Sequence, residues 1–389
     1  MKSIFLSLLA SAVFHFSGGQ DRNIEFYKEL EQKLIADHTG SIAYIYGGVD
    51  SIPALIGSVT SIKKLNLKGN RIQSVPGSIG RLTLLKELTL DENRIESLPE
   101  SIGDLKNLVI LELGSNQLST LPDSFSGLEK LGRLMLFKNQ FKEMPFNVVE
   151  CRDLYWVDMW KNQIERLPED IYKLKNLSYL RLENNRLKHL PARFGELSSL
   201  EKLNLSENEL ERLPESIGQL KYLSVLNLDH NEITELPNSV GNLSQLTEMN
   251  LYKNKLKELP ESMGDLKNLK TLKVIFNSLE KLPKTLGGCE SLEELLAYEN
   301  QLEALPESIG DLPNLRTLWV SNNNLKSLPE SIGKLDKLEV LSVYDNDLVT
   351  LPESLKNLTN LKKLYIKRNK ISEEEISNWK TILPNCTID

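Results

Sequence analysis

The sequence is poor in the residues that support catalysis, metal binding and disulfide bonding. Its 389 residues include three cysteines and four histidines. The histidines are scattered, with no cysteine or carboxylate at the spacing of a metal site. No glycine-rich phosphate loop follows a strand, and the Gly-x-Ser-x-Gly motif is absent. We therefore expect no cofactor, no metal and no enzymatic activity.

Charge and hydropathy exclude two further classes of protein. The formal net charge is −7 and is spread along the chain, without the basic stripe of a nucleic-acid-binding protein. No apolar stretch beyond the N-terminus is long enough to span a bilayer. The N-terminus itself, with Lys2 and an apolar run at residues 4–16, fits a signal peptide over residues 1–19. The alternative is an ordinary N-terminal segment of a cytoplasmic protein.

One pattern dominates the rest of the chain: an asparagine recurs fourteen times at one constant interval, without insertion or deletion. The positions are Asn70, Asn93, Asn116, Asn139, Asn162, Asn185, Asn208, Asn231, Asn254, Asn277, Asn300, Asn323, Asn346 and Asn369. A fixed period of this length is typical of a solenoid, in which each repeat buries its apolar face against its neighbours.

Each repeat has two apolar segments of different period. In the copy around Asn208, Leu203 and Leu205 alternate as on one face of a short strand. Ile217, Leu220 and Leu223 follow at helical spacing, which indicates a turn of 3₁₀ or α helix. The asparagine lies where the chain leaves the strand, and its amide can bond backbone groups there. We expect this column to be structural.

The repeat resembles the leucine-rich repeat family. The 23-residue length and the phrase Leu-Pro-Glu-Ser-Ile-Gly-x-Leu, at residues 98–105 and 305–312, resemble a subclass found in Ras-group intracellular proteins and many bacterial proteins. This resemblance covers residues from about 40 to the C-terminus. It implies an α/β leucine-rich repeat solenoid, curved, with a parallel sheet on the concave face and short 3₁₀ or α segments on the convex face. It also implies a protein-binding role.

The ends of the chain depart from the repeat, as the ends of a solenoid do. We divide the chain into a signal peptide (1–19), an N-terminal cap helix with a degenerate repeat (20–61), the solenoid (62–371) and a C-terminal cap (372–389). Residues 21–37 are predicted as an amphipathic helix with Ile24, Tyr27, Leu30 and Leu34 on one side. At the other end Glu375 replaces the repeat's proline, and Trp379 is expected to close the core.

The cysteines are placed by the repeat register. Cys151 in the repeat of Asn139 and Cys289 in the repeat of Asn277 occupy the same interior position. They are six repeats apart, roughly 29 Å at the strand spacing, whereas a disulfide needs Cα atoms within about 7 Å. Cys386 lies in the C-terminal cap. We expect buried thiols and no intrachain disulfide.

The candidate binding surface is the set of strand residues that point away from the core, four in each repeat. Ten of these 56 positions are aromatic, about one in six, against 6% in the whole chain. They are Phe137, Trp156, Trp160, Tyr179, Tyr252, Phe276, Tyr298, Trp319, Tyr344 and Tyr365. A first patch contains Met135 and the first four, in which we expect Phe137 to stack on Trp160 and Trp156 on Tyr179. A second contains Ile275, Leu296 and the remaining six.

Two interpretations of the aromatics remain open. Strands favour aromatic residues, and stacked rings would stabilise neighbouring repeats. Exposed aromatic clusters in polar surroundings also mark recognition sites, and strand propensity alone does not explain the clustering. The first hypothesis for function is a monomeric, exported, non-enzymatic module that binds a protein through the concave aromatic face, in the periplasm, at the cell surface or secreted. The alternatives are a cytoplasmic scaffold of the Ras-group type and a glycan-binding surface protein.

Overall fold

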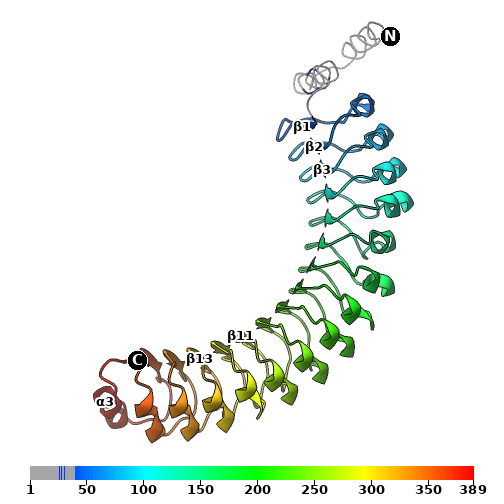
Figure 1. Ribbon diagram of the computed structural model, residues 1–389. Coiled ribbons are helices and arrows are strands. Elements are labelled where there is room, and N and C mark those ends of the chain that lie inside the picture. The colour runs from blue at the N-terminus through cyan, green and yellow to red at the C-terminus, as the bar shows by residue number, and fades with distance from the viewer. Residues whose placement is uncertain (1–25, 27, 29, 31–39) are drawn as a thin grey trace, which may run out of the picture. The chain divides into compact units, whose positions relative to one another are not determined.

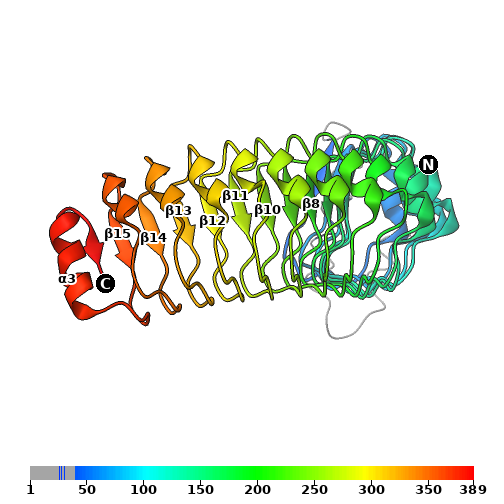
Figure 2. The same cartoon turned by 90° about the horizontal axis from the view of Figure 1, so that it is seen from below.

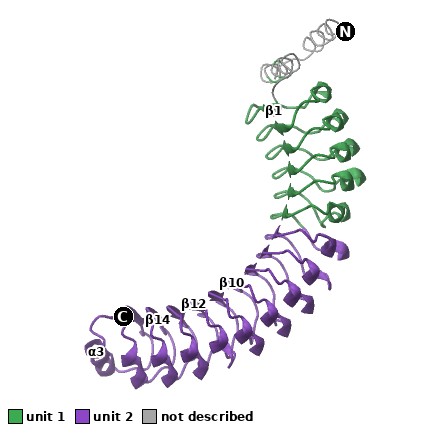
Figure 3. Ribbon diagram, viewed as in Figure 1, with its two compact units in different colours: residues 1–163 green, residues 164–389 purple. Residues whose placement is uncertain are grey.

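The structure is a computed structural model that describes residues 26, 28, 30 and 40–389 (Figure 1). It divides into two compact units, residues 1–163 and 164–389 (Figure 3). In each unit the strands lie side by side and parallel, in chain order, and the helices of the repeats lie on the opposite side. The proposed signal peptide lies outside the described residues.

Unit 1 contains six described strands of three residues each. They are β1 (Ser41–Ala43), β2 (Lys64–Asn66), β3 (Glu87–Thr89), β4 (Ile110–Glu112), β5 (Arg133–Met135) and β6 (Trp156–Asp158). The 3₁₀ helices between them are η1 (Ala54–Ser58), η2 (Gly77–Arg81), η3 (Glu100–Asp104), η4 (Asp123–Gly127) and η5 (Phe146–Glu150). The pairing register advances by one full repeat per strand, as the sequence period predicts: Leu65 pairs with Leu88, and Leu88 with Leu111.

Unit 2 continues the same alternation and bends so that its strands lie on the concave side (Figure 3). Its strands are β7 (Tyr179–Arg181), β8 (Lys202–Asn204), β9 (Val225–Asn227), β10 (Glu248–Asn250), β11 (Thr271–Lys273), β12 (Glu294–Leu296), β13 (Thr317–Trp319), β14 (Val340–Ser342), β15 (Lys363–Tyr365) and β16 (Thr387–Ile388). Its 3₁₀ helices are η6 (Glu169–Lys173), η7 (Phe194–Glu196), η8 (Glu215–Gln219), η9 (Asn238–Asn242), η10 (Glu261–Asp265), η11 (Leu286–Gly288), η12 (Glu307–Asp311), η13 (Glu330–Lys334) and η14 (Glu353–Asn357). Figure 2 shows these coils side by side, with α3 (Glu373–Ile382) beyond β15.

The core consists of the repeat's apolar columns. Leu203, Leu205, Ile217, Leu220 and Leu223 are all at most 1% exposed, as predicted. Prolines at most helix starts hold extended backbone with φ near −70°, where their missing N–H costs least. The convex segments are 3₁₀ rather than α helices throughout the described repeats, because five residues leave room for little more than one turn.

The asparagine column is structural, as predicted. In unit 1, Nδ2 of Asn116 donates to the carbonyls of Leu90 and Leu113 at 2.9 and 3.0 Å. Its Oδ1 accepts from the backbone N–H of Ile95 at 3.0 Å. The same contacts recur around Asn208 in unit 2. Each side chain therefore bonds backbone groups of two consecutive repeats at the point where the strand ladder stops.

The residue before each repeat asparagine adopts left-handed backbone. Glu92, Lys138, His230 and Phe276, for example, have φ of 57°, 50°, 52° and 52°. Non-glycine residues rarely adopt this conformation, and bulky ones least of all. The fold thus imposes a small backbone cost in each repeat except that of Asn70, where Gly69 holds this position, and turns this side chain toward the open side of the sheet.

Both ends carry caps. At the N-terminal end Phe26 and Leu30 are helical and fully buried, Lys28 is exposed, and the Phe26 ring lies 5.5 Å from that of Tyr44. The apolar face of the predicted helix therefore includes Phe26, which the sequence argument did not name; Ile24, Tyr27 and Leu34 lie outside the described residues. Strand β1 confirms that the degenerate first repeat keeps the register.

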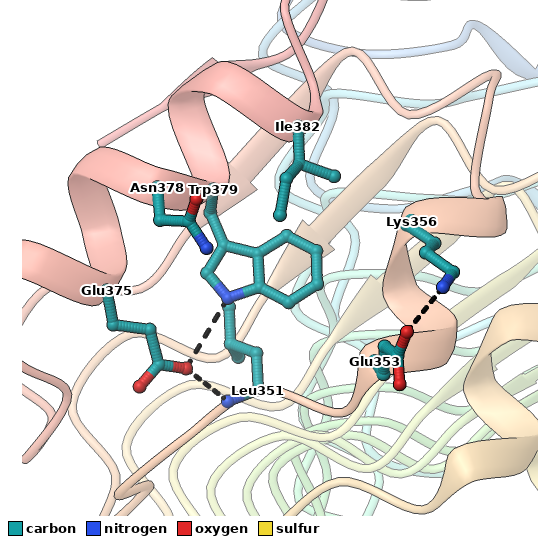
Figure 4. Close-up of a pocket in the computed structure, with 7 residues that line it drawn as sticks. All are labelled: Leu351, Glu353, Lys356, Glu375, Asn378, Trp379 and Ile382. Atoms are coloured by element: carbon teal, nitrogen blue, oxygen red, sulfur yellow. Dashed lines mark hydrogen bonds and ion pairs between the residues drawn. The ribbon is translucent and has the colours of Figure 1, made fainter.

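At the C-terminal end, α3 begins after Ser372, whose hydroxyl accepts from the Glu375 N–H. Trp379 is 5% exposed and closes the core, as predicted. Glu375 Oε1 accepts from the backbone N–H of Leu351 at 2.9 Å and from Trp379 Nε1 at 3.4 Å (Figure 4). The short strand β16, which pairs with β15, was not predicted.

The three cysteines are free thiols, as expected. Cys151 and Cys289 are fully buried, and burial raises the pKa of each to about 12. Cys386 is half-buried. Across residues 40–389 and the three described positions before them, no helix combines the length and hydropathy needed to cross a membrane.

Candidate functional site

The ten predicted aromatic residues lie on the open side of the sheet, which we call the strand face, and none is fully buried. Phe276 and Trp319 are 42% and 39% exposed, and the other eight are half-buried. Phe137, Trp156 and Trp160 belong to unit 1, and the remaining seven to unit 2. The rings are thus accessible at their faces or edges while their stems pack against the sheet.

In unit 1, Phe137 and Trp160 stack as the register predicts. Their centroids are 5.7 Å apart and their planes differ by 11°. Two cations lie over the tryptophans: Lys138 Nζ is 4.8 Å from the Trp160 ring and the Arg133 guanidinium 5.1 Å from the Trp156 ring. The predicted pair of Trp156 and Tyr179 joins residues of different units and stays a prediction.

A glycine makes room for this stack. A Cβ on Gly114 would lie 2.3 Å from the Phe137 ring, so the ring lies directly against the backbone of the preceding repeat. The Phe137 ring therefore packs against the Gly114 backbone in the preceding repeat and against the Trp160 ring in the following repeat. The sequence signal for this contact, a small residue one repeat before an aromatic one, is present at Gly114 and was missed.

In unit 2, five rings form a continuous row across five repeats, which we call the ring row: His230, Tyr252, Phe276, Tyr298 and Trp319. Successive centroids are 5.0, 5.6, 6.2 and 6.1 Å apart. The planes of neighbouring rings differ by 72°, 85°, 72° and 55°, so the first three pairs meet edge to face and the pair of Tyr298 and Trp319 is tilted. Such contacts are favourable for aromatic pairs and leave a corrugated surface.

The continuous ring row includes fewer residues than the second patch defined from the sequence. Ile275 is only 6% exposed, so it belongs to the core and contributes little surface. Among the described residues no ring contact joins Tyr344 or Tyr365 to the row; Tyr344 instead lies 5.4 Å beneath the Arg368 guanidinium. His230, which was not among the predicted site residues, extends the row through its contact with Tyr252.

Beside the row, three asparagines occupy equivalent positions on adjacent strands and form what we call the asparagine ladder. Asn204 pairs in register with Asn227, and Asn227 with Asn250. Each Oδ1 accepts from the N–H two residues further along the chain, just past the end of the strand, at 3.1, 3.3 and 3.1 Å. This bond fixes each amide, and in the described part of the chain the three Nδ2 groups have no hydrogen-bond partner.

Charged residues on the strands and on the flanks of the repeats pair mostly with the equivalent position of the next repeat. Lys64 with Glu87 at 2.7 Å and Arg316 with Glu339 at 2.7 Å are examples. These exposed pairs contribute little stability individually. On the strand face near the N-terminal end, Asp91 is 5% exposed, and burial raises its pKa to about 6. The strand face thus includes one carboxyl group that is costly to ionise.

The strand face carries no arrangement typical of a catalytic centre within the described residues. His230 Nδ1 lies 2.9 Å from Asp229 Oδ2, but no nucleophile completes a triad with them there. No cluster of three His, Cys, Asp or Glu side chains that could hold a metal occurs in the described ranges. What the face offers is aromatic surface, side-chain amides and charge, which are the components of a binding site.

Comparisons with known proteins agree with the repeat register. The family described as "Leucine-rich repeat region" matches residues 50–140, 203–295 and 296–382, and "Leucine rich repeat" matches residues 152–210. No curated protein sequence matches the chain.

Three solved structures are similar along most of the chain. A leucine-rich repeat protein of Leptospira interrogans is 33% identical, with 93% of this chain and 98% of that one covered and a TM-score of 0.79. The plant peptide hormone receptor RGFR1, in complex with RGF2, is 27% identical over 90% of this chain and 62% of its own, with a TM-score of 0.74. A TDR receptor is 27% identical over 97% of this chain and 68% of its own, with a TM-score of 0.76. With its repeat register, its parallel strands and these matches, the chain belongs to the leucine-rich repeat family.

Proposed function

We propose that this protein is an exported, non-enzymatic binding module that recognises a protein partner through the aromatic residues of its strand face. The observation that carries the proposal is the accessibility of the rings. All ten predicted residues keep exposed surface, and Phe276 and Trp319 are about 40% exposed. Burying such surface in a partner is favourable by roughly 25 cal/mol per Å² before association costs.

The backbone supports a role for Phe276 beyond stability. Its φ of 52° is a conformation that a bulky side chain adopts at a cost, and asparagine or glycine would fit better. Because Phe276 is exposed and its backbone conformation is strained, its side chain is retained for the binding surface that the ring offers. If the residue served only to stabilise neighbouring repeats, a residue that adopts positive φ without backbone strain would be favoured.

The similar structures support a protein or peptide partner. One of them is a plant peptide hormone receptor in complex with RGF2. This chain spans 62% of that receptor's length, so the comparison bears on the repeat surface and not on the whole receptor. A solenoid of this kind presents an extended surface to a partner.

A pull-down from the native source, with wild type against a Trp156→Ala/Trp160→Ala double variant, tests the proposal. We expect the partner's affinity to fall by about 30-fold or more, the equivalent of about 2 kcal/mol. Phe146→Ala is the matched control, because Phe146 is 70% exposed on η5, away from the strand face of the same unit. Unchanged binding with a large loss of thermal stability would instead support the purely structural interpretation of the rings.

Export is tested separately from binding. The mass of the purified native protein reports its mature N-terminus, and cleavage near residue 19 is expected. A chain that begins at Met1 would leave the cytoplasmic scaffold as the better hypothesis, with the same binding surface.

A further inference from the structure

The backbone N–H two residues before the repeat asparagine points to the strand face. In the repeats of the asparagine ladder this N–H has an acceptor on that face. The N–H groups of Ser206, Asp229 and Tyr252 donate to Oδ1 of Asn204, Asn227 and Asn250, at 3.1, 3.3 and 3.1 Å. These asparagines stand at outward positions of β8, β9 and β10, next to a buried leucine or methionine. Since an outward side chain reaches this N–H, an acceptor of a ligand on the same face reaches it too.

In the next four repeats the same N–H has no acceptor. It belongs to Ile275, Tyr298, Ser321 and Tyr344, and none of these N–H groups donates to an atom of the described residues. The capping asparagine is replaced there by Lys273, Leu296, Trp319 and Ser342. The first three side chains carry no acceptor, and the hydroxyl of Ser342 is bonded to that of Ser321 at 2.6 Å. Because most backbone N–H groups of folded proteins are paired, four consecutive unpaired donors about 4.8 Å apart call for acceptors from outside the chain.

Two lysines stand at the first of these donors. Lys273 ends β11, two residues before Ile275, and is half-buried. Lys253 lies beside Ile275 in the preceding repeat, because the Lys253 N–H donates to the Ile275 carbonyl at 2.9 Å. Neither ammonium group pairs with a carboxylate within the described residues. Two positive charges and the N–H groups of Ile275 and Tyr298 therefore occur together within three consecutive repeats.

These donors determine the class of ligand. Two N–H groups about 4.8 Å apart can both donate to one oxygen, or to two oxygens of one group, at the usual distance of about 2.9 Å. Ammonium groups strengthen such bonds to an anion and bind phosphate as point charges. The acids nearby compete little: Glu248 and Glu294 stand at the other ends of their strands, and Oε1 of Glu299 is bonded to Asn322 at 2.7 Å. A tetrahedral oxyanion, with several oxygens, accepts from four donors better than a planar carboxylate does.

We propose that Lys253, Lys273 and the backbone N–H groups of Ile275 and Tyr298 bind a tetrahedral oxyanion, a phosphate or sulfate group, on the strand face of unit 2. The oxyanion is either a free ion or an ester group of a larger ligand, and both present the same oxygens to the four donors. The site needs no protein partner, so it goes beyond the proposed function and is tested without one.

Isothermal titration calorimetry on the full-length protein tests the site. The probes are sodium phosphate, sodium sulfate, glycerol 3-phosphate and sodium acetate, at one ionic strength held with sodium chloride because salt screens the lysines. We expect saturable one-site binding of phosphate or sulfate, and binding of acetate weaker by about tenfold or more. Glycerol 3-phosphate that binds as tightly as phosphate assigns the site to an ester group, whereas glycerol 3-phosphate that fails to bind assigns it to the free ion.

Two variants remove the donors by different means. Leu296→Asn places an asparagine before Tyr298 as Asn250 stands before Tyr252, so its Oδ1 should cap the Tyr298 N–H without changing charge. We expect affinity for the oxyanion to fall by about fivefold. The double variant Lys253→Gln/Lys273→Gln removes both charges and should weaken binding by about tenfold or more.

Each variant has a matched control. Thr89→Asn places the same residue at the equivalent outward position of β3, in unit 1. Lys202→Gln removes an exposed lysine of β8 that forms no ion pair within the described residues. Both controls should leave affinity within about twofold of wild type, as surface substitutions usually do. Circular dichroism of all four variants verifies that the fold is intact.

Three results would overturn the proposal. They are no saturable binding of phosphate or sulfate, acetate binding as tight as phosphate binding, and oxyanion binding that is unchanged both by Leu296→Asn and by the double lysine variant. The outcome is independent of the pull-down with Trp156→Ala/Trp160→Ala. A protein that binds the oxyanion at Lys273 but captures no partner would retain this site and reject the proposed function, and the reverse result would do the opposite.

Discussion

The backbone N–H of Leu187 donates a 3.0 Å hydrogen bond to Oδ1 of Asn208, 21 residues further along the chain. In return Nδ2 of Asn208 donates to the carbonyls of Leu182 at 2.9 Å and Leu205 at 3.1 Å. One side chain thus satisfies backbone groups of two consecutive repeats. Asn208 is 8% exposed, so water cannot readily replace these bonds.

Asn208→Ala is therefore expected to lower the free energy of unfolding by about 1–3 kcal/mol, since it leaves buried backbone groups unpaired. Asn204→Ala is the control: Asn204 is half-buried, and among the described residues its side chain accepts only from the N–H and hydroxyl of Ser206. It should change stability by less than about 0.5 kcal/mol. Urea unfolding followed by circular dichroism measures both. Equal stability of wild type and Asn208→Ala would contradict a buried ladder.

Most of this architecture could be predicted from the sequence because one period determines it. Once Asn208 is assigned to the end of a strand, Leu203 and Leu205 must be core, and the register of every neighbour follows by adding one repeat length. The structure at the two ends could not be predicted in this way, because the repeat period does not extend to them. Strand β16 pairs with β15 after a helix that breaks the register, and Phe26 packs on Tyr44 from outside the repeats.

Phe276→Asn is expected to separate stability from binding. At φ of 52°, asparagine is tolerated better than phenylalanine, so the backbone should gain about 0.5–1 kcal/mol, less what the lost ring contacts contribute. Binding of the partner should weaken, because the ring joins Tyr252 to Tyr298. Calorimetry and an affinity measurement on one preparation test this. A strong loss of stability, with affinity unchanged, would mark Phe276 as a structural residue.

The site was less predictable than the fold, for a physical reason. Sequence register gives the strand and the side of the sheet, and so the stack of Phe137 on Trp160 followed from it. It does not give side-chain rotamers or how deeply a side chain is covered. The tilt between Phe276 and Tyr298 and the burial of Ile275 depend on these, and the sequence argument missed both.

Asp91 makes the stability of the fold depend on pH, and the direction of this dependence follows from its raised pKa. Burial is the main cause that raises its pKa from 3.8 to about 6, so the folded chain binds this proton more tightly than the unfolded chain. Between pH 4 and 6 stability therefore falls as pH rises, and above about pH 6 the charged carboxylate is destabilising. Asp91→Asn keeps an oxygen for the Gly114 N–H, which now donates to Asp91 Oδ1 at 2.6 Å.

The variant should be more stable than wild type by on the order of 1–3 kcal/mol above pH 6, with the difference vanishing below about pH 4. Urea unfolding of both proteins at several pH values measures that difference, and effects of other carboxyl groups cancel in it. A difference that is constant with pH, or that grows toward acid, would show that Asp91 ionises normally in the folded protein.

Glu375 occupies the position at which the repeats carry proline, and its contacts explain the change. Its carboxylate accepts from the Leu351 N–H at 2.9 Å (Figure 4). The carboxylate also accepts from Thr350 Oγ1 at 2.8 Å, and the Glu375 N–H donates to Ser372 Oγ at 3.1 Å. One residue thus caps α3 and bonds the edge of the last full repeat. Restoring proline by Glu375→Pro removes all three bonds and disfavours helical backbone at Glu374.

We expect Glu375→Pro to destabilise the C-terminal cap by about 2 kcal/mol or more, whereas Glu375→Gln keeps the oxygen acceptor and should cost less than about 1 kcal/mol. Since a solenoid opens locally, hydrogen exchange is the sensitive measurement. Amides from residue 351 to the end should exchange faster in Glu375→Pro, while those of β8 and β9 stay protected. Glu374→Ala, another acid of the same first turn, is the control. If its effect on exchange equals that of Glu375→Pro, general helix propensity and not the bond to Leu351 holds the cap in place.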